Sequence, residues 1–253
     1  MIFILSPFES PCEARGNRNI AMAELLARSN DLIFLTSNFS HQAKRQFSYS
    51  EIKSVRSDRF SYVFMKSIGY KRNISVRRVL CHWHLSVKFF FYILSKSKKN
   101  DKVILSSIPP ETFFLISFLK LKGLMIHVDV RDVWPEAFPK KTSVLFSAFS
   151  YYCRLLNILS LKVSIITYTA PSFYKYVGRY AKQNASVYFL PLGYCDRRWA
   201  SFEGVKSFNN TIRLVYVGSL EEQCPLDQVI GALDSLPNFS LTVIGDGSKY
   251  YYY

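Results

Sequence analysis

Short apolar runs alternate along the chain with longer segments whose apolar residues recur at helical spacing. The first strand–helix–strand unit is predicted at Ile2–Leu5, Asn17–Ser29 and Asp31–Thr36. Further strands are predicted at Phe60–Met65, Val103–Ser106, Leu124–Asp129, Val163–Tyr168 and Ser186–Leu190, and further helices at Ser75–Ser95, Glu111–Leu121, Ser143–Leu159 and Pro171–Ala181. Strands made of continuous apolar runs are typical of a parallel sheet with helices on both faces. We therefore expect an α/β fold in which residues 1–190 form a doubly wound, Rossmann-like domain.

A polar, aperiodic segment at residues 191–211 is typical of a linker between domains. The alternation then resumes with a strand at Ile212–Val217, a helix at Pro225–Leu236 and a strand at Phe239–Ile244. This pattern predicts the start of a second Rossmann-like domain over residues 212–253. Two parallel strands and one helix bury too little apolar surface for a stable core. We therefore expect this domain to be incomplete and the chain to be truncated at its C-terminus.

Composition narrows the class of protein. The 253 residues are 49% hydrophobic and 16% aromatic, which excludes a disordered chain and predicts a globular one. Charged residues interrupt every apolar stretch before about 18 residues accumulate, so no transmembrane helix is expected. The N-terminus has no signal-peptide pattern. Five cysteines without a CxxC pair favour a reducing compartment and neither a disulfide framework nor a metal site.

Charge is unevenly distributed along the chain. The net charge is +15, and residues 200–253 hold 3 basic and 6 acidic side chains, so the excess of cations lies before them. Ten basic residues and no acidic residue lie between Arg59 and Asn100. The helix expected in this region has an apolar stripe formed by Val79, Leu80, Trp83, Val87, Phe90, Phe91 and Leu94.

Two interpretations of this basic helix stay open. A basic amphipathic helix suits an anionic membrane surface, whereas the stripe could equally pack on the sheet with the lysines solvated. Nucleic-acid binding would also suit the charge, but no recognition module is present and we do not expect it.

Two loops at the ends of predicted strands carry candidate site residues. The loop after the first strand contains Arg15, Gly16 and Asn17 and leads into a helix N-terminus, where backbone N–H groups attract anions. It lacks the GxGxxG pattern of dinucleotide-binding proteins, and an ordinary βα loop is the alternative. Arg131, Asp132 and Glu136 follow the strand that ends at Asp129, where parallel sheets bind ligands. The alternative there is a surface ion pair between Arg131 and Asp132 beside a packing residue, Trp134.

The segment Asp129–Glu136 resembles the Arg-Asp-x-Trp-Pro-Glu sequence of a bacterial branch of the family-4 glycosyltransferases, which have the two-domain GT-B fold. Three other places match in order and spacing: Arg15–Arg18 with Thr36–His41, Leu190–Tyr194, and Leu214–Leu220 followed by Ile244–Gly247. The resemblance therefore spans nearly the whole chain.

The resemblance implies a retaining transfer of a sugar from a nucleotide-sugar donor to a polyprenyl-linked or saccharide acceptor in surface-polysaccharide synthesis. It implies no cofactor and no metal, and a cytoplasmic, peripheral location at the inner face of the cell membrane. By position, Arg131, Asp132 and Glu136 are the catalytic candidates. The substrate-binding candidates are Arg15, Gly16, Asn17, Gly218, Ser219, Gly245 and Gly247. Those of the second domain would approach the donor diphosphate.

Three features depart from the family pattern. Arg131 stands where many relatives have histidine, and Glu221-Glu222-Gln223 stands where relatives place a cation. The sequence ends at Tyr253, before the position of the family's Glu-x7-Glu motif. We therefore expect weak donor binding and slow turnover by this chain. The alternative is a non-catalytic basic protein that binds an anionic membrane or nucleic acid.

Overall fold

The computed structural model describes residues 1–13, 18–73, 75–138, 143–193, 212–220, 226–247 and 249–252. The chain divides into two compact units. The first comprises Met1–Ala137 and Thr142–Cys195, and the second lies mainly within Asp196–Tyr253. Each unit is described by itself below.

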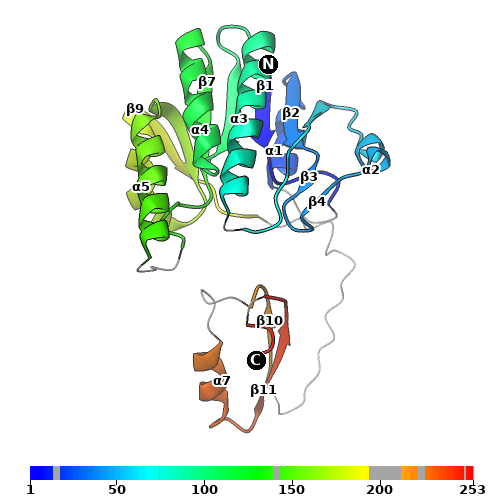
Figure 1. Cartoon of the computed structure of the whole chain (residues 1–253), viewed down its shortest axis with the longest axis vertical. Coiled ribbons are helices and arrows are strands. Elements are labelled where there is room, and N and C mark those ends of the chain that lie inside the picture. The colour runs from blue at the N-terminus through cyan, green and yellow to red at the C-terminus, as the bar shows by residue number, and fades with distance from the viewer. Residues whose placement is uncertain are drawn as a thin grey trace. The chain divides into compact units, whose positions relative to one another are not determined.

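The first unit is built on a seven-stranded sheet in which every neighbouring pair is parallel. Its order is β5-β2-β1-β6-β7-β8-β9, so the chain first builds one half of the sheet and then returns to build the other (Figure 1). The strands are β1 Ile2–Ser6, β2 Leu32–Ser37, β5 Ser61–Met65, β6 Lys102–Ser106, β7 Met125–Val130, β8 Val163–Tyr168 and β9 Ala181–Phe189. The strand order reverses between β1 and β6, which is the Rossmann arrangement.

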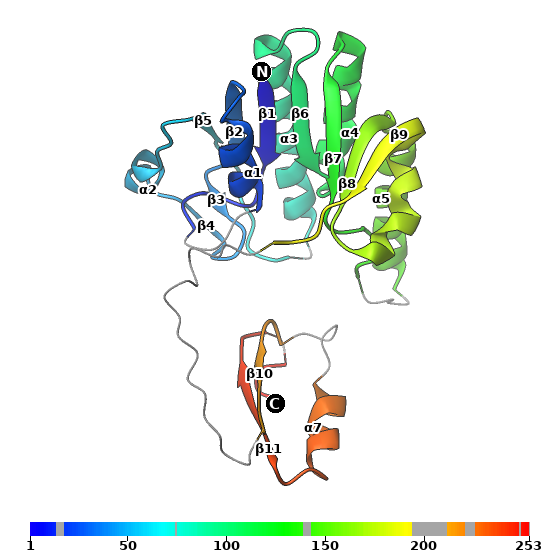
Figure 2. The ribbon, with the colours of Figure 1, turned by 180° about the vertical axis from the view of Figure 1, so that it is seen from behind.

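Helices lie on both faces of this sheet. Viewed from behind, α1 lies in front of the sheet, while α3, α4 and α5 lie on the opposite face (Figure 2). The α-helices of the first unit are α1 Arg18–Leu26, α2 Tyr49–Ser54, α3 Val76–Lys96, α4 Pro110–Ser117 and α5 Val144–Leu159, and the 3-10 helices are η1 Phe118–Lys122 and η2 Pro171–Arg179. The doubly wound α/β fold predicted from the sequence is confirmed.

Two apolar clusters, one for each face, form the core. Phe3 and Leu5 of β1 belong to the larger cluster together with α3 and α4, whereas Ile2 and Ile4 pack with Ala23 of α1. Every residue of β1 is therefore buried, which explains why the strand is a continuous apolar run.

Helix α3 has a buried stripe that differs from the one predicted. Cys81, Leu85, Phe89 and Ile93, spaced four residues apart, face the core and are inaccessible to solvent. Of the predicted stripe, Leu80, Val87 and Phe91 are exposed. The helix therefore carries apolar residues on more than one side.

Several elements differ from the sequence-based expectation. Strand β9 begins at Ala181 instead of Ser186, and the helix predicted at Glu111–Leu121 is α-helical only to Ser117 and continues as the 3-10 helix η1. The segment Pro171–Arg179 forms a 3-10 helix instead of an α-helix. It contains three aromatic residues and Gly178, and these residue types have low α-helix propensity. A small hairpin of β3 Phe39–Ser40 and β4 Arg45–Gln46 and the short helix α2 were not predicted. Two-residue strands leave no periodicity to detect, because period-2 alternation needs several residues.

The second unit pairs β10 Ile212–Val217 with β11 Phe239–Ile244 in parallel over six residues, joined through α7 Asp227–Leu233. Both strands have the bounds predicted from the sequence. Val215, Val217 and Ile244 are exposed, so the described part of this unit buries little of its sheet. Most of the predicted linker, residues 194–211, lies outside the described residues.

Candidate active site

The predicted site residues of the first unit that the structure describes lie at the carboxyl ends of its strands. The strand order reverses between β1 and β6, so the loops after these two strands run in opposite directions. Open parallel sheets bind ligands in the crevice between such loops. Ser107, after β6, ties two of these loops together. Its N–H donates to the Asp129 carbonyl at 3.1 Å, and its Oγ donates to the Asp132 carbonyl at 2.9 Å.

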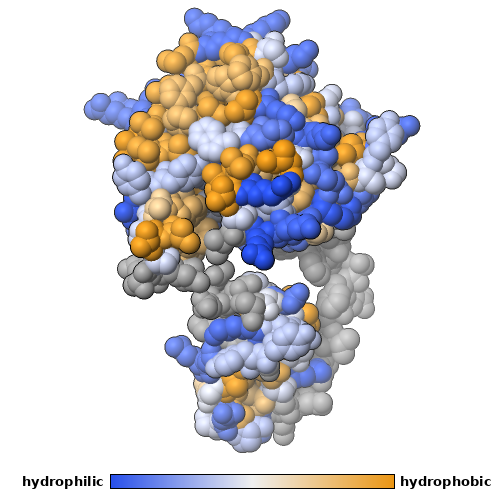
Figure 3. All heavy atoms as spheres, viewed as in Figure 1, coloured by the Kyte–Doolittle hydropathy of each residue, from blue (hydrophilic) through white to orange (hydrophobic). Residues whose placement is uncertain are grey.

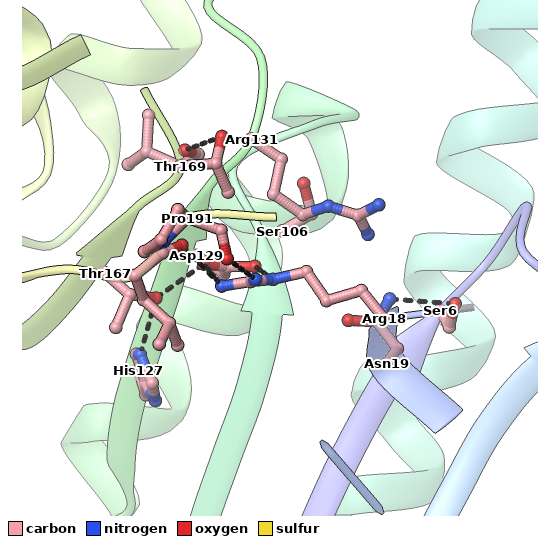
Figure 4. Close-up of polar contacts among 12 residues, drawn as sticks. Ser6, Arg18, Asn19, Ser106, His127, Asp129, Arg131, Thr167, Thr169 and Pro191 are labelled. Atoms are coloured by element: carbon pink, nitrogen blue, oxygen red, sulfur yellow. Dashed lines mark hydrogen bonds and ion pairs between the residues drawn. The ribbon is translucent and has the colours of Figure 1, made fainter. Parts of the chain in front are cut away.

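Asp129, at the end of β7, is 1% exposed and pairs with Arg18, the first residue of α1. Arg18 Nε and Nη2 lie 3.0 and 3.3 Å from the two carboxylate oxygens. The same guanidinium donates to the carbonyls of Leu190 and Pro191 at 3.0 and 2.8 Å. Figure 4 shows Arg18 reaching from α1 to Asp129 beside Pro191. Arg18 thus fixes the start of α1 against β7 and against the segment that leaves β9.

Two further side chains complete the environment of Asp129. Thr167 Oγ1 of β8 donates to Asp129 Oδ1 at 2.6 Å, and His127 Nε2 lies 3.1 Å from the same hydroxyl (Figure 4). Because the threonine proton points to the carboxylate, His127 donates to Thr167. Burial lowers the pKa of His127, although the charge of Asp129 opposes the shift. The buried carboxylate is therefore compensated by one cation and one hydroxyl.

Arg131, one of the predicted catalytic residues, pairs with Glu9 of the loop after β1. Arg131 Nη1 and Nη2 lie 2.9 and 2.5 Å from the Glu9 carboxylate oxygens. Asn19 Nδ2 donates to the same carboxylate and to Ser6 Oγ, both at 3.0 Å. Burial lowers the pKa of Arg131, but the hydrogen bonds and charge of Glu9 outweigh it and raise the pKa overall. The pairing of Arg131 with Asp132, offered as an alternative from the sequence, is not what the structure shows.

Asp132 uses both carboxylate oxygens within its own turn. Oδ1 accepts from the Val133 N–H at 2.8 Å, and Oδ2 accepts from the Trp134 indole N–H at 3.0 Å. Trp134 is buried, as the packing alternative expected. The carboxylate therefore holds the shape of the loop after β7.

Glu136 ends this loop and pairs with Arg179 of η2, whose Nη1 and Nη2 lie 2.7 and 2.5 Å from its oxygens. Arg154 of α5 lies 4.0 Å away. The hydrogen bonds from Arg179 lower the pKa of Glu136, so this carboxylate is a poor general acid near neutral pH.

An aromatic cluster lines the same edge of the sheet. The ring of Phe8 lies 5.1 Å from that of His82 and 6.2 Å from that of Tyr70, and His82 lies 6.2 Å from Trp134. The guanidinium of Arg78 lies 5.0 Å from the Trp134 ring. Phe8, Tyr70 and Trp134 come from the segments after β1, β5 and β7, and Arg78 and His82 come from α3, so only the folded sheet brings these side chains together.

The glycines predicted to bind the donor lie after β10 and β11. Gly218 donates its N–H to Ile244, and Leu220 donates to the Asp246 carbonyl, both at 3.0 Å, so the two loops lie side by side. A Cβ on Gly245 would collide with the Gly218 carbonyl oxygen, and one on Gly247 with the Leu220 backbone. Ser219 belongs to the same loop, where its carbonyl accepts from the Tyr216 hydroxyl at 2.8 Å. Glycine is required here for close approach of backbone to backbone.

The remaining predicted residues, Arg15, Gly16 and Asn17, lie outside the described residues. Sequence reasoning did not assign Arg18, Glu9 or Asn19 to the site. Arg18 lies next to the predicted loop residues, and Glu9 is the first carboxylate after β1. Their positions after the end of a strand could therefore have marked both residues as site candidates. In the described part of the chain, no three His, Cys, Asp or Glu side chains gather as a metal site would require.

Comparison with known proteins identifies the fold. No family model matches the sequence, and no curated protein matches it. The structure resembles an α,α-trehalose-phosphate synthase (UDP-forming) from Burkholderia vietnamiensis, with a TM-score of 0.60, 9% identity, and coverage of 99% of this chain and 65% of that one. It also resembles Arabidopsis thaliana UGT89C1 complexed with UDP-L-rhamnose, with a TM-score of 0.54, 10% identity, and coverage of 97% and 68%.

A third similar structure is a trehalose-6-phosphate synthase studied with bisubstrate glycomimetics for glycosyl transfer with retention. Its TM-score is 0.60 at 10% identity, and the match covers 98% of this chain and 64% of that one. The chain has the GT-B glycosyltransferase fold. It spans about two thirds of the length of these proteins.

Proposed function

We propose that this chain belongs to a retaining glycosyltransferase that moves a sugar from a nucleotide-sugar donor to a polyprenyl-linked or saccharide acceptor in surface-polysaccharide synthesis. The observation that carries the proposal is the GT-B fold with polar residues at the strand ends where such sheets bind ligands. The resemblance to a bacterial branch of the family-4 glycosyltransferases supports the finer assignment. In this proposal the first unit contributes the acceptor side and the second unit the donor side.

The residues of the two units suit different parts of this chemistry. A departing nucleoside diphosphate gains negative charge, and fixed N–H groups and guanidinium groups stabilise it. Arg131, held by Glu9, is the first unit's candidate for that role. The glycine loops after β10 and β11, where Gly245 and Gly247 allow close approach of backbone, are the second unit's candidates for the surface that lies against the diphosphate. Asp132 and Glu136 then act as positioning residues for the loop that carries Arg131.

The proposal is tested with a panel of UDP- and GDP-sugars in titration calorimetry and with a transfer assay on polyprenyl-linked acceptors. We expect donor binding that Arg131→Gln weakens. The control Arg28→Gln, which removes an exposed cation in the turn after α1, should leave donor binding unchanged. Circular dichroism of both variants checks the fold. A chain that binds none of the donors and transfers no sugar contradicts the proposal.

We also propose peripheral association with the inner face of the cell membrane. Helix α5 exposes Val144, Leu145, Tyr151 and Ile158, and α3 exposes Phe91 near the cations Lys96, Lys98 and Lys99. Figure 3 shows apolar residues gathered over the side of the molecule where α4 and α5 lie. Exposed apolar residues combined with cations suit an anionic lipid surface. No described helix is both long enough and apolar enough to cross a membrane.

Vesicle co-sedimentation tests the membrane proposal. Replacing Lys96, Lys98 and Lys99 by Gln, or Leu145 and Ile158 by Ser, should release the protein from vesicles that contain phosphatidylglycerol. Neutral vesicles are the control for the charge contribution. Equal co-sedimentation of all variants argues against this surface, and stronger binding to duplex DNA than to vesicles favours the nucleic-acid alternative.

A further inference from the structure

A cationic pocket lies between the β3–β4 hairpin and the segment that leads into α3. It has a volume of about 520 Å³. The hairpin contributes Phe39, Lys44, Arg45 and Gln46, and the second wall is formed by Ile68, Gly69, Tyr70, Lys71, Arg72, Ser75 and Arg77. Five of these side chains are cationic and none is acidic. Apart from Tyr70, which also belongs to the aromatic cluster described above, these lining residues are not among those assigned to the candidate active site.

Four of the five cations have no carboxylate partner among the described residues. Arg45 pairs with Glu51 of α2 at 2.6 Å, whereas Lys44, Lys71, Arg72 and Arg77 form no ion pair in that part of the chain. Arg77 donates instead to the carbonyls of Gly69 and Ile68, at 3.0 and 3.1 Å, and so holds one wall in place. Concentrating unpaired cations is electrostatically unfavourable, and a bound anion relieves it.

Two residues that line the pocket, Lys44 and Gly69, have positive φ angles. Lys44 has φ +53°, a left-handed conformation that is uncommon for a residue other than glycine. Gly69 has φ +61°, and a Cβ there would lie 2.9 Å from the Phe39 ring. Burial lowers the pKa of Lys44, and the charge of Arg78 lowers it further. Both walls of the pocket therefore include a residue with a left-handed backbone, Lys44 in the hairpin and Gly69 in the segment before α3.

We propose that this pocket binds the phosphate groups of a phosphate-bearing ligand. Lys44, Lys71 and Arg72 supply the charge, and the rings of Phe39 and Tyr70 with Ile68 supply an apolar wall for the remainder of the ligand. Tyr70 also contacts Phe8 of the loop after β1, which joins the pocket to the candidate active site. We identify this ligand with the sugar acceptor, and that identification rests on the proposed glycosyl transfer. Phosphate binding by the pocket does not depend on it.

Two sources of this chemistry exist, a soluble phosphorylated molecule and the headgroup of a membrane lipid. Titration with inorganic pyrophosphate and with geranyl diphosphate probes the first source. Flotation with vesicles containing phosphatidylglycerol probes the second. All binding is measured without a sugar donor and without turnover, so failure of the transferase proposal and failure of the pocket proposal are distinguishable.

The decisive variant is Lys44→Gln with Lys71→Gln and Arg72→Gln, which leaves the structural residue Arg77 in place. The control, Arg28→Gln with Arg56→Gln and Arg59→Gln, removes the same charge from exposed positions outside the pocket. We expect the pocket variant to weaken binding by about tenfold or more and the control to change it by less than about twofold. Lys71→Gln alone, at an exposed position, keeps the test valid if the triple variant does not fold.

Each result has a defined meaning. Loss of diphosphate binding in the pocket variant alone supports the proposal with a soluble ligand, and loss of vesicle binding in that variant alone supports it with a lipid headgroup. Equal loss in both triple variants shows that only net charge matters and overturns the proposal. Absence of binding to every probe, or binding to duplex DNA alone, also overturns it.

Discussion

Arg18, the first residue of α1, forms a two-pronged ion pair with Asp129, which lies 111 residues later at the end of β7. The carboxylate is 1% exposed and the guanidinium side chain 13%. Removing one partner from a buried pair leaves the other charge uncompensated, at a cost of about 3–5 kcal/mol. This relationship ties the start of α1 to the end of β7.

The first prediction concerns this pair. Arg18→Met should lower the free energy of unfolding by about 3 kcal/mol in urea denaturation, because Thr167 is then the one side-chain donor to Asp129 among the described residues. Arg18→Met combined with Asp129→Leu should lose less than the single variant. The matched control is Arg45→Gln, whose ion pair with Glu51 is exposed and screened by water, so its loss should change the free energy of unfolding far less. Similar losses for the buried and the exposed pair would contradict this account.

The second prediction concerns the glycine loops of the second unit. Gly245→Ala should shift the loop after β11 away from Gly218, because the added Cβ would occupy the position of a carbonyl oxygen. We expect faster exchange of the Gly218 N–H, which donates to Ile244, in hydrogen-exchange measurements. Gly231→Ala, in α7, is the control because nothing lies within 4 Å of its added Cβ. Unchanged exchange in Gly245→Ala would show that the loop tolerates a side chain.

The third prediction is a pH dependence. Arg179 lowers the pKa of Glu136 below its ordinary value of about 4.5, so the unfolded chain binds more protons than the folded one at acidic pH. The stability from this pair is complete above about pH 4.5 and is lost as the pH falls through the folded pKa. Glu136→Gln should therefore be less stable than the wild type at pH 7, with the difference shrinking towards pH 3. A difference that is independent of pH would exclude the ion pair as its cause.

The fourth prediction concerns His82, which is buried between Arg78 and Glu111. Arg78 Nε donates to His82 Nε2 at 3.3 Å, which leaves Nδ1 to carry the proton towards Glu111 at 3.2 Å. Burial lowers the pKa of His82, although Glu111 opposes the shift. Long-range proton–nitrogen NMR correlations should show a neutral Nδ1–H imidazole at about pH 6, where an exposed histidine is largely charged.

The Arg78→Gln variant is the comparison for this measurement. Removing the cation should raise the pKa of His82, because the charge of Arg78 is one of the causes that lower it. Protonation of both ring nitrogens near pH 6.5 in the wild type would contradict the assignment. Stability should accordingly decrease as the pH falls below the ordinary histidine value, since the unfolded chain then binds the additional proton.

Most strands could be predicted because they read as continuous apolar runs, which in β1 reflects burial on both faces. Val163–Tyr168, Ile212–Val217 and Phe239–Ile244 have the predicted bounds. The predicted ranges of two helices start at Ser75 and Ser143, and in the structure these serines are the N-caps of α3 and α5, accepting from the N–H groups of Arg78 and Phe146. The β3–β4 hairpin was not predicted, although it supplies one wall of the cationic pocket.

The candidate site was predictable in position but not in its contacts. Arg131, Asp132 and Glu136 lie after β7, where a parallel strand presents its carboxyl end, and this follows from local sequence. Their partners do not follow from it. Arg131 pairs with Glu9, 122 residues away, and Glu136 with Arg179, 43 residues away.

The sequence by itself determined the alternation of strands and helices, the parallel sheet and the excess of cations, because hydrophobic spacing and charge are properties of neighbouring residues. Only the tertiary structure decided that Arg18 neutralises Asp129 and that Lys44 lies across a pocket from Lys71. These pairings depend on strand order, which brings distant loops to one edge of the sheet. Strand order is set by the burial of the whole sheet, and no local pattern encodes it.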